Sequence, residues 1–161
     1  MLDNDTKTSQ LYMSAAIKLA ETASKRGEVP VGAVVVDGVS GEVLARAHNR
    51  IEELRDATAH AEILALQEAA RVKNSSRLVD CDLYVTLEPC TMCAGAISLA
   101  RVRRLYFGAD DHKGGGIEHG ARVFGQPTCN HAPEVYGGID ARRSEELLHK
   151  FFTKLRRTAD D

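Results

Sequence analysis

Several features that would place a protein in a membrane or outside the cell are missing from this sequence of 161 residues. No apolar run approaches the roughly 20 residues that cross a bilayer, so we expect no membrane partner. The N-terminal stretch MLDNDTKTSQ is polar and acidic, and it lacks the basic and then apolar pattern of a signal peptide. These absences together predict a cytoplasmic protein.

Positive charge is not in excess, and cysteine is scarce. The formal net charge of −2 excludes a generally basic surface, so any contact with nucleic acid must come from local patches. In a cytoplasmic protein, Cys81, Cys90, Cys93 and Cys129 should be thiols or metal ligands rather than a disulfide framework. Repeats, low-complexity segments and linkers are also missing. The sequence therefore predicts a single domain over residues 1–161, with its core at about 9–157.

Helices and strands are expected to alternate along the chain. Apolar spacing and turn residues predict helices at 9–27, 59–72, 90–100 and 141–157, and strands at 30–37, 41–48, 82–88 and 103–109. Asp140 is expected to cap the last helix. Residues 110–134 are rich in Gly, Asn and Pro and predict a long loop, which in a compact domain is usually functional. This order indicates an α/β fold of three layers, α/β/α, around a mixed sheet.

The pair Cys90 and Cys93, in EPCTMCAGA, is ambiguous when taken alone. Residues three apart at a helix start can turn their sulfurs to one face, and the helix N-terminus favours the thiolate. A strand followed by C-x-x-C at the start of a helix also describes a thioredoxin-type redox site. A zinc ribbon would need a second C-x-x-C, which Cys81 and Cys129 do not supply.

A second stretch, TAHAEILAL, favours a catalytic zinc site. His60 stands at the start of the other predicted helix, and three ligands (His60, Cys90, Cys93) would leave one position of a tetrahedral zinc open. Such a site acidifies a bound water. Glu62 points to a different side of the helix from His60, so it suits a proton shuttle better than a fourth ligand. Taken alone, a histidine at a helix start is more often a cap or a surface residue, and a glutamate there more often complements the helix dipole. The combination predicts about one zinc ion per chain.

The motifs H-x-E and P-C-x-x-C resemble those of the cytidine-deaminase-type zinc hydrolases, for which they are a known signature. The stretches EVPVGAVVV, AHNR, TAHAEILAL, LYVTLEPCTMCAGAI and FGADDHKGG resemble, in the same order, those of the bacterial tRNA-specific adenosine deaminases, over about residues 11–157. The resemblance implies a cytidine deaminase-like fold with a central mixed five-stranded sheet, and a homodimer. It also implies hydrolytic deamination of adenosine to inosine at the wobble position of an arginine tRNA. One departure is Ala57, where the family often has Pro.

The same resemblance implies roles for six residues. Zinc ligation falls to His60, Cys90 and Cys93, proton transfer to Glu62, base recognition to Asn49 and ribose contact to Asp111. By themselves, Asn49 could be a turn-former and Asp111 a cap on the turn before Lys113. A base must leave its stack to reach a buried metal, which makes the anticodon loop a cheaper substrate than a duplex.

Two basic stretches are candidates for phosphate contacts, RVRR at 101–104 and HKFFTKLRR at 149–157. The second mixes cations with aromatics, as stacking platforms do, although a charged helix face with inward phenylalanines is an equally good interpretation. Two other functions stay open. One is a deaminase of a free base or nucleoside such as guanine or cytosine, and the other is a zinc-stabilised RNA-binding module. Glu62 argues against the module, because a structural metal site has no use for a carboxylate beside an open position.

Overall fold

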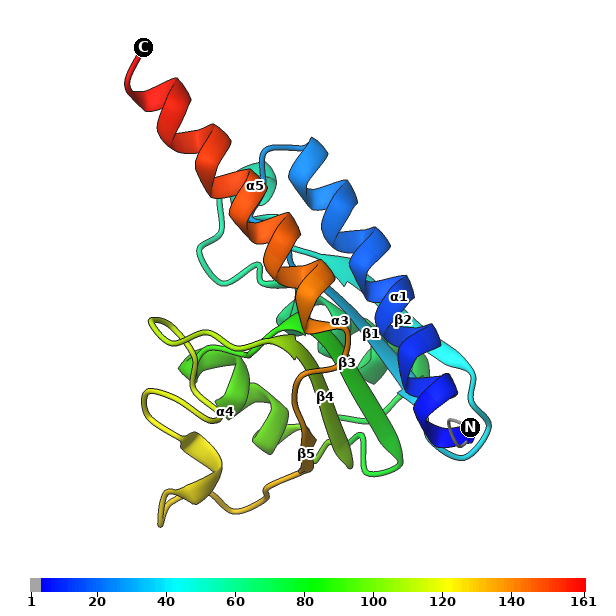
Figure 1. Cartoon of the computed structure of the whole chain (residues 1–161). Coiled ribbons are helices and arrows are strands. Elements are labelled where there is room, and N and C mark those ends of the chain that lie inside the picture. The colour runs from blue at the N-terminus through cyan, green and yellow to red at the C-terminus, as the bar shows by residue number, and fades with distance from the viewer. Residues whose placement is uncertain (1–3) are drawn as a thin grey trace.

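A five-stranded sheet runs through the middle of the computed structural model, which describes residues 4–161 (Figure 1). The first three residues of the predicted signal-free N-terminus lie outside that range. The strands, in chain order, are β1 (Gly32–Asp37), β2 (Val43–His48), β3 (Cys81–Leu87), β4 (Arg104–Ala109) and β5 (Glu134–Tyr136). In the sheet the order is β2-β1-β3-β4-β5. β1 pairs antiparallel with β2 and β3, whereas β3, β4 and β5 are parallel, which confirms the predicted mixed sheet.

Helices cover both faces of this sheet. Their bounds are α1 (Asn4–Lys25), α2 (Ile51–Leu54), α3 (Ala61–Lys73), α4 (Thr91–Leu99) and α5 (Ala141–Ala159), with a 3-10 turn η1 (Val123–Gly125). α1 and α5 lie on one face, and α3 and α4 pack on the other (Figure 1). The predicted three-layer α/β/α architecture is confirmed. Among the described helices, none is both long and apolar enough to span a bilayer.

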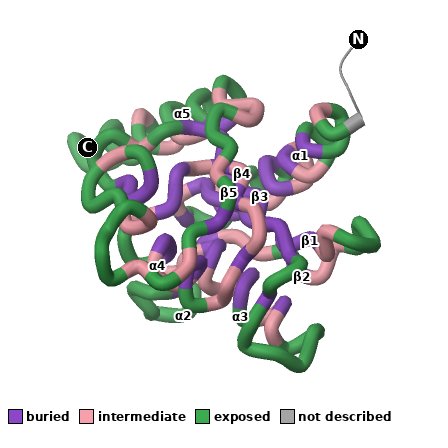
Figure 2. Tube along the Cα trace, turned by 90° about the horizontal axis from the view of Figure 1, so that it is seen from below, coloured by how far each residue is buried: buried purple, intermediate pink, exposed green. Residues whose placement is uncertain are grey.

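Strand β1 divides the core between the two faces, because successive side chains of a strand point to opposite sides. Val34 and Val36 pack with Met13 and Ile17 of α1. The alternate residues of β1 pack with α3, α4 and the inner side chains of β3 and β4. Figure 2 shows the result, with buried strands at the centre and exposed helix surfaces around them. Both faces of β1 are therefore dry, which fits its unbroken apolar run.

The first helix begins at Asn4 rather than at residue 9 and ends two residues earlier than predicted, at Lys25. Three further details differ from the sequence-based expectation. α2 and β5 were not predicted as separate elements, because each is only three or four residues long. The prediction that Asp140 caps α5 is wrong: Asp140 has the left-handed φ of 53° and makes no side-chain cap. Its carboxylate instead accepts a hydrogen bond from the Arg143 guanidinium at 2.9 Å.

Candidate functional site

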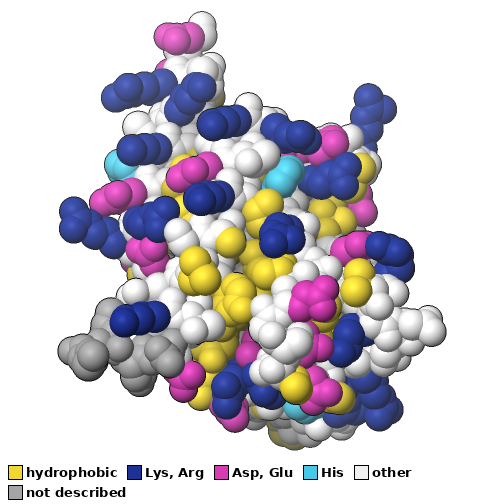
Figure 3. Space-filling model, turned by 90° about the vertical axis from the view of Figure 1, so that its right-hand side faces the viewer, with side chains coloured by type: hydrophobic (Ala, Val, Ile, Leu, Met, Phe, Trp, Pro, Cys, Tyr) yellow, Lys and Arg dark blue, Asp and Glu magenta, His cyan; other side chains and the backbone are white. Residues whose placement is uncertain are grey.

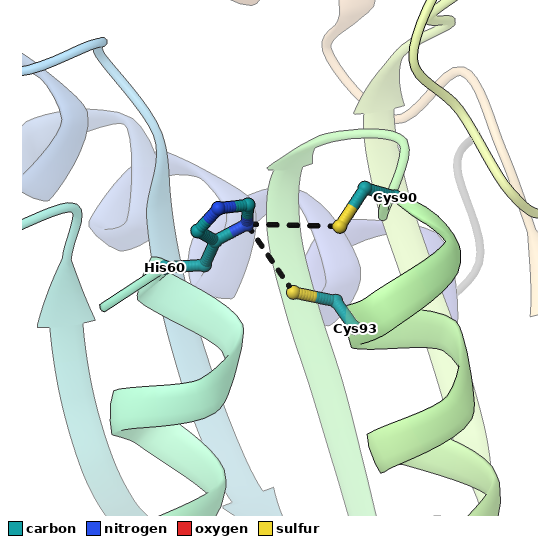
Figure 4. A group of neighbouring side chains, drawn as sticks. All are labelled: His60, Cys90 and Cys93. Carbon is teal, nitrogen blue, oxygen red and sulfur yellow. Dashed lines mark hydrogen bonds between the residues drawn. The ribbon is translucent and has the colours of Figure 1, made fainter. Parts of the chain in front are cut away.

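The three predicted metal ligands meet where α3 and α4 begin. His60 and Cys90 are the extended residues that immediately precede α3 and α4, and Cys93 lies in the first turn of α4. Strand β3 delivers the chain to this point, since it ends at Leu87. Figure 4 shows the imidazole of His60 facing both sulfurs across the gap between the two helix starts.

The distances in this cluster fit a tetrahedral zinc ion. His60 Nδ1 lies 3.7 Å from Cys90 Sγ and 3.5 Å from Cys93 Sγ, and the three donor atoms all lie within 4.8 Å of one another. Bonds of about 2.3 Å to sulfur and about 2.0 Å to nitrogen require a nitrogen–sulfur edge of about 3.5 Å in a tetrahedron. The cluster can therefore hold zinc through Nδ1 of the histidine, with one tetrahedral position left over.

The two thiols share a proton unequally. A hydrogen bond from the Cys93 thiol lowers the pKa of Cys90 to about 5, helped by the backbone N–H groups of Cys93 and Met92 and opposed by partial burial. The same hydrogen bond, together with burial, raises the pKa of Cys93. The pair thus carries about one negative charge at neutral pH, and a divalent cation that displaced the remaining proton would gain a second thiolate.

Glu62 lies against this cluster from the first turn of α3. Its side chain is only 4% exposed, and this burial raises the pKa of the carboxyl to about 7, more than His60 and the Cys93 thiol lower it. A carboxyl with a pKa near 7 can both take up and release a proton under neutral conditions. The structure therefore brings together the four residues that the two sequence motifs predicted.

Asn49, at the end of β2, is held in one orientation by α3. Its Oδ1 accepts a hydrogen bond of 2.8 Å from the backbone N–H of Ala61. A backbone N–H can only donate, so the amide oxygen must face α3 and the amide nitrogen must point elsewhere. Within residues 4–161 no hydrogen bond takes up that nitrogen. Asn49 is only 5% exposed, and it thus offers its amide NH₂ group as a donor in one orientation.

Asp111 caps the turn that follows it. Its Oδ1 accepts hydrogen bonds from the backbone N–H groups of Lys113 at 3.2 Å and Gly114 at 2.9 Å. The turn-capping interpretation of this residue is therefore confirmed, and it leaves the second carboxylate oxygen available. Whether that oxygen contacts ribose stays a prediction.

Two buried carboxylates near the site were not singled out from the sequence. Glu28 accepts hydrogen bonds from the backbone N–H groups of Ile51, Glu52 and Glu53 and so caps α2. Glu88 accepts hydrogen bonds from the loop that follows β4. The one sequence signal was that Glu88 closes an apolar strand, directly before the Pro89 of the cysteine motif.

Two of the three arginines in the basic stretch at 101–104 are engaged in ion pairs, whereas a phosphate contact by Arg101 stays a prediction. Arg103 makes a two-pronged ion pair with Asp82, at 2.9 and 2.7 Å, and Arg104 pairs with Glu134 at 3.0 Å. Both arginines stand at the start of β4, whereas the loop that carries Asp111 follows the other end of that strand. These two arginines are therefore paired with carboxylates, and they lie at the opposite end of β4 from the loop that carries Asp111.

Comparison with known proteins supports the same chemistry. The chain matches the family described as "Cytidine and deoxycytidylate deaminase zinc-binding region" over residues 6–109. It is 54% identical to the tRNA-specific adenosine deaminase of Agrobacterium fabrum over 145 residues, which are 90% of this chain and 94% of that protein.

Solved structures resemble the chain as well. One comes from a study entitled "Biochemical and Structural Studies of A-to-I Editing by tRNA:A34 Deaminases at the Wobble Position of Transfer RNA"; it is 54% identical, with a TM-score of 0.83 over 86% of this chain and 99% of that one. A guanine deaminase from Nitrosomonas europaea is 23% identical, with a TM-score of 0.76 over 94% of this chain and 93% of that one. At that identity the second likeness shows the shared fold and does not choose a substrate.

Proposed function

This chain belongs to the tRNA-specific adenosine deaminases, within the zinc-binding cytidine and deoxycytidylate deaminase family, and we propose that it converts the wobble adenosine of a tRNA anticodon to inosine. The reaction consumes one water per adenosine and releases ammonia. Its chemistry is carried by one observation, a buried carboxyl group placed against three convergent zinc donors. The substrate is supported by the identity with relatives that carry this name.

Zinc is held by His60 Nδ1 and the sulfurs of Cys90 and Cys93 in this proposal. When bound there, zinc supplies a water that is acidified towards neutral pKa at its open position. Glu62 accepts a proton from the attacking water on its carboxylate and delivers it to N1 of adenine. The oxygen of that water bonds to C6. The carboxylate next takes the remaining proton of this oxygen and delivers it to the amino group, so ammonia leaves and C6 keeps the oxygen as the carbonyl of inosine. Because Glu62 is buried, bulk water does not exchange protons with its carboxyl group during this transfer.

Asn49 and Asp111 orient the flipped nucleotide. The free amide N–H of Asn49 donates to an acceptor on the purine edge, since its oxygen is already bound to Ala61. Asp111 accepts a hydrogen bond from the ribose 2′-OH, which is a donor that deoxyribose lacks. A base that is splayed out in a single-stranded loop reaches these groups without the cost of opening a duplex.

The C-terminal half of α5 provides the basic surface for the rest of the anticodon arm. This part projects beyond the sheet in Figure 1, and at the top of Figure 3 Lys and Arg side chains lie along it, below a tip that carries acidic side chains. Exposed Phe152 adds a ring on which a base can stack. We further propose an arginine tRNA as substrate, a homodimer as the assembly and the cytoplasm as the location, as in the family.

A substrate panel tests this function against a free-base deaminase. The protein is incubated with an anticodon stem-loop RNA that carries adenosine at the wobble position, and separately with adenosine, guanine and cytosine, while ammonia is measured. We expect release from the stem-loop alone. Faster release from guanine or cytosine would replace the proposed substrate by a free base. No release from any of them, with RNA still bound, would favour the zinc-stabilised binding module.

A further inference from the structure

The carboxylate of Glu88 is wholly buried and accepts five hydrogen bonds from one loop. Its Oε1 receives the backbone N–H of Asp111 at 3.1 Å and Nδ1 of His119 at 2.7 Å. Its Oε2 receives the backbone N–H groups of Ile117, Glu118 and His119 at 3.1–3.2 Å. The side chain is 0% exposed. One carboxylate thus fixes both ends of the segment from 111 to 119.

The same segment packs directly against residues 89–90, which belong to the cysteine motif. Gly116 donates its N–H to the carbonyl of Pro89 at 2.8 Å, and Gly115 forms an isolated β-bridge with Cys90. A Cβ on Gly115 would overlap the Glu88 carboxylate and the Asp111 carbonyl. Only glycine fits between these two groups. A Cβ on Gly116 would lie 2.7 Å from the backbone nitrogen of Thr91 and 2.9 Å from the carbonyl carbon of Cys90, so the loop packs closely on the metal-ligand segment.

Neither a second metal site nor simple core filling explains this carboxylate. Glu88, Asp110 and His119 do lie close enough together to hold a cation, but both Glu88 oxygens are already filled by N–H donors of the described loop. Burying a carboxylate costs free energy that an apolar side chain would not. The charge is matched by donors that all belong to one loop, so its effect is to hold that loop in one arrangement.

We propose that Glu88 is a positioning residue for substrate: it holds Asp111 at a set place relative to Cys90, so that the ribose contact and the metal centre act on the same nucleotide. This inference rests on the proposed function, because it assigns to Asp111 the contact with ribose. It adds a residue that touches neither the metal nor the RNA.

Substitution of Glu88 by glutamine distinguishes the donors that bind Oε2 from the donors that bind Oε1. The amide of Glu88→Gln has one acceptor oxygen, which can remain with the three backbone donors at Ile117, Glu118 and His119. Its NH₂ group then faces the Asp111 N–H and the His119 ring. The imidazole can change tautomer and accept a hydrogen bond, but a backbone N–H cannot. The substitution therefore removes the hydrogen bond of the Asp111 N–H, while the other donors of the loop can keep theirs.

A double-mutant cycle with Asp111→Asn on a wobble-adenosine stem-loop RNA tests the inference. Loss of a hydrogen bond to a charged group is worth about ten- to a hundred-fold, so Asp111→Asn should raise KM by that factor. Glu88→Gln should also raise KM, up to the same factor, with kcat and zinc content unchanged. The double variant should be no worse than Asp111→Asn, because both changes remove one interaction. The matched control, Glu118→Gln on an exposed neighbour, should behave as the unmodified protein.

Three results would overturn the inference. They are KM increases that multiply in the double variant, a fall in kcat at unchanged KM, and loss of zinc from Glu88→Gln. If Glu88→Gln does not fold, His119→Ala replaces it in the cycle, because it removes one donor to the same carboxylate from a side chain that is 26% exposed. The same non-additivity is then expected on a smaller scale.

A measurement without substrate separates this inference from the proposed function. Amide hydrogen exchange over residues 111–119 of the zinc-loaded protein should accelerate in Glu88→Gln and stay unchanged in Glu118→Gln. If the unmodified protein makes no inosine while this acceleration is seen, the proposed function fails and the positioning of the loop stands. Unchanged exchange in Glu88→Gln overturns the inference whatever the activity.

Discussion

Cys93 and Glu62 lie in the first turns of neighbouring helices, yet their removal should have different consequences. Cys93→Ala takes away one of three donors, and we expect it to lose zinc and activity together. The measurement is zinc per chain by elemental analysis, alongside turnover.

Cys129→Ala is the matched control, since Cys129 lies outside the metal cluster and its thiol donates to the carbonyl of His131. It should keep zinc. Full zinc content in Cys93→Ala would defeat the assignment of the ligands.

Glu62→Ala should keep zinc, fold and RNA binding, because Glu62 is not needed as a ligand. It should lose turnover by about a hundred- to ten-thousand-fold, or more, as expected when a general acid–base group is removed. Single-turnover rates and zinc analysis on the same preparation check this. Near-native turnover would mean that the carboxyl transfers no proton.

Asp111→Asn should lower the preference for RNA over DNA. Asparagine can keep the turn, since its oxygen can still accept from Lys113 and Gly114, while the charge is removed. We expect action on the RNA loop to weaken by about ten- to a hundred-fold and the relative rate on single-stranded DNA of the same sequence to rise. The ratio of the two rates is the measurement, and an unchanged ratio would leave Asp111 as a turn cap only.

Residues that stand inside short motifs could be predicted from the sequence, and residues whose partners are distant could not. The zinc ligands and Glu62 follow from H-x-E and P-C-x-x-C because each motif places them at a helix start. The role of Glu88 depends on donors 23 to 31 residues further along the chain, which no local spacing indicates. The orientation of Asn49 likewise depends on Ala61, across the loop between β2 and α3.

The packing of α1 on β1 depends on Gly32. A Cβ there would overlap the carbonyl of Ala16 and lie 2.8 Å from the backbone nitrogen of Ala20, so the helix would have to move away from the strand. We expect Gly32→Ala to lower the free energy of unfolding by about 1–3 kcal/mol, as overpacking does. The midpoint of urea denaturation measures this.

Gly95→Ala in α4 provides the comparison, because a Cβ at Gly95 meets no atom within 4 Å. Here the smaller conformational freedom of alanine should raise stability by about 0.5–1 kcal/mol. Equal midpoints for the two variants would contradict this account of helix packing.

Long, periodic elements could be predicted from the sequence to within a few residues, as α3 and β3 show. β5 could not, because three residues of which two are exposed have no usable pattern, and their place in the sheet is set by pairing with β4. Asp140 illustrates a second limit: a favourable capping residue type does not fix the backbone dihedral that a side-chain cap requires.

For the molecule as a whole, the site exists only because the sheet brings separate segments together. His60 and Cys90 are 30 residues apart in the sequence, and they meet because α3 packs on β1 while α4 follows β3, its neighbour in the sheet. The alternation of elements predicted the layers but not this strand order. The resemblance to a known family supplied the five strands in advance.

The most direct test of the account is to sequence tRNA before and after incubation with the zinc-loaded protein, because inosine is copied as guanosine. The account predicts an adenosine-to-guanosine change at the first anticodon position, with adenosines elsewhere unaltered, and no change with Glu62→Ala. An unchanged wobble position, or the same change produced by Glu62→Ala, would contradict it.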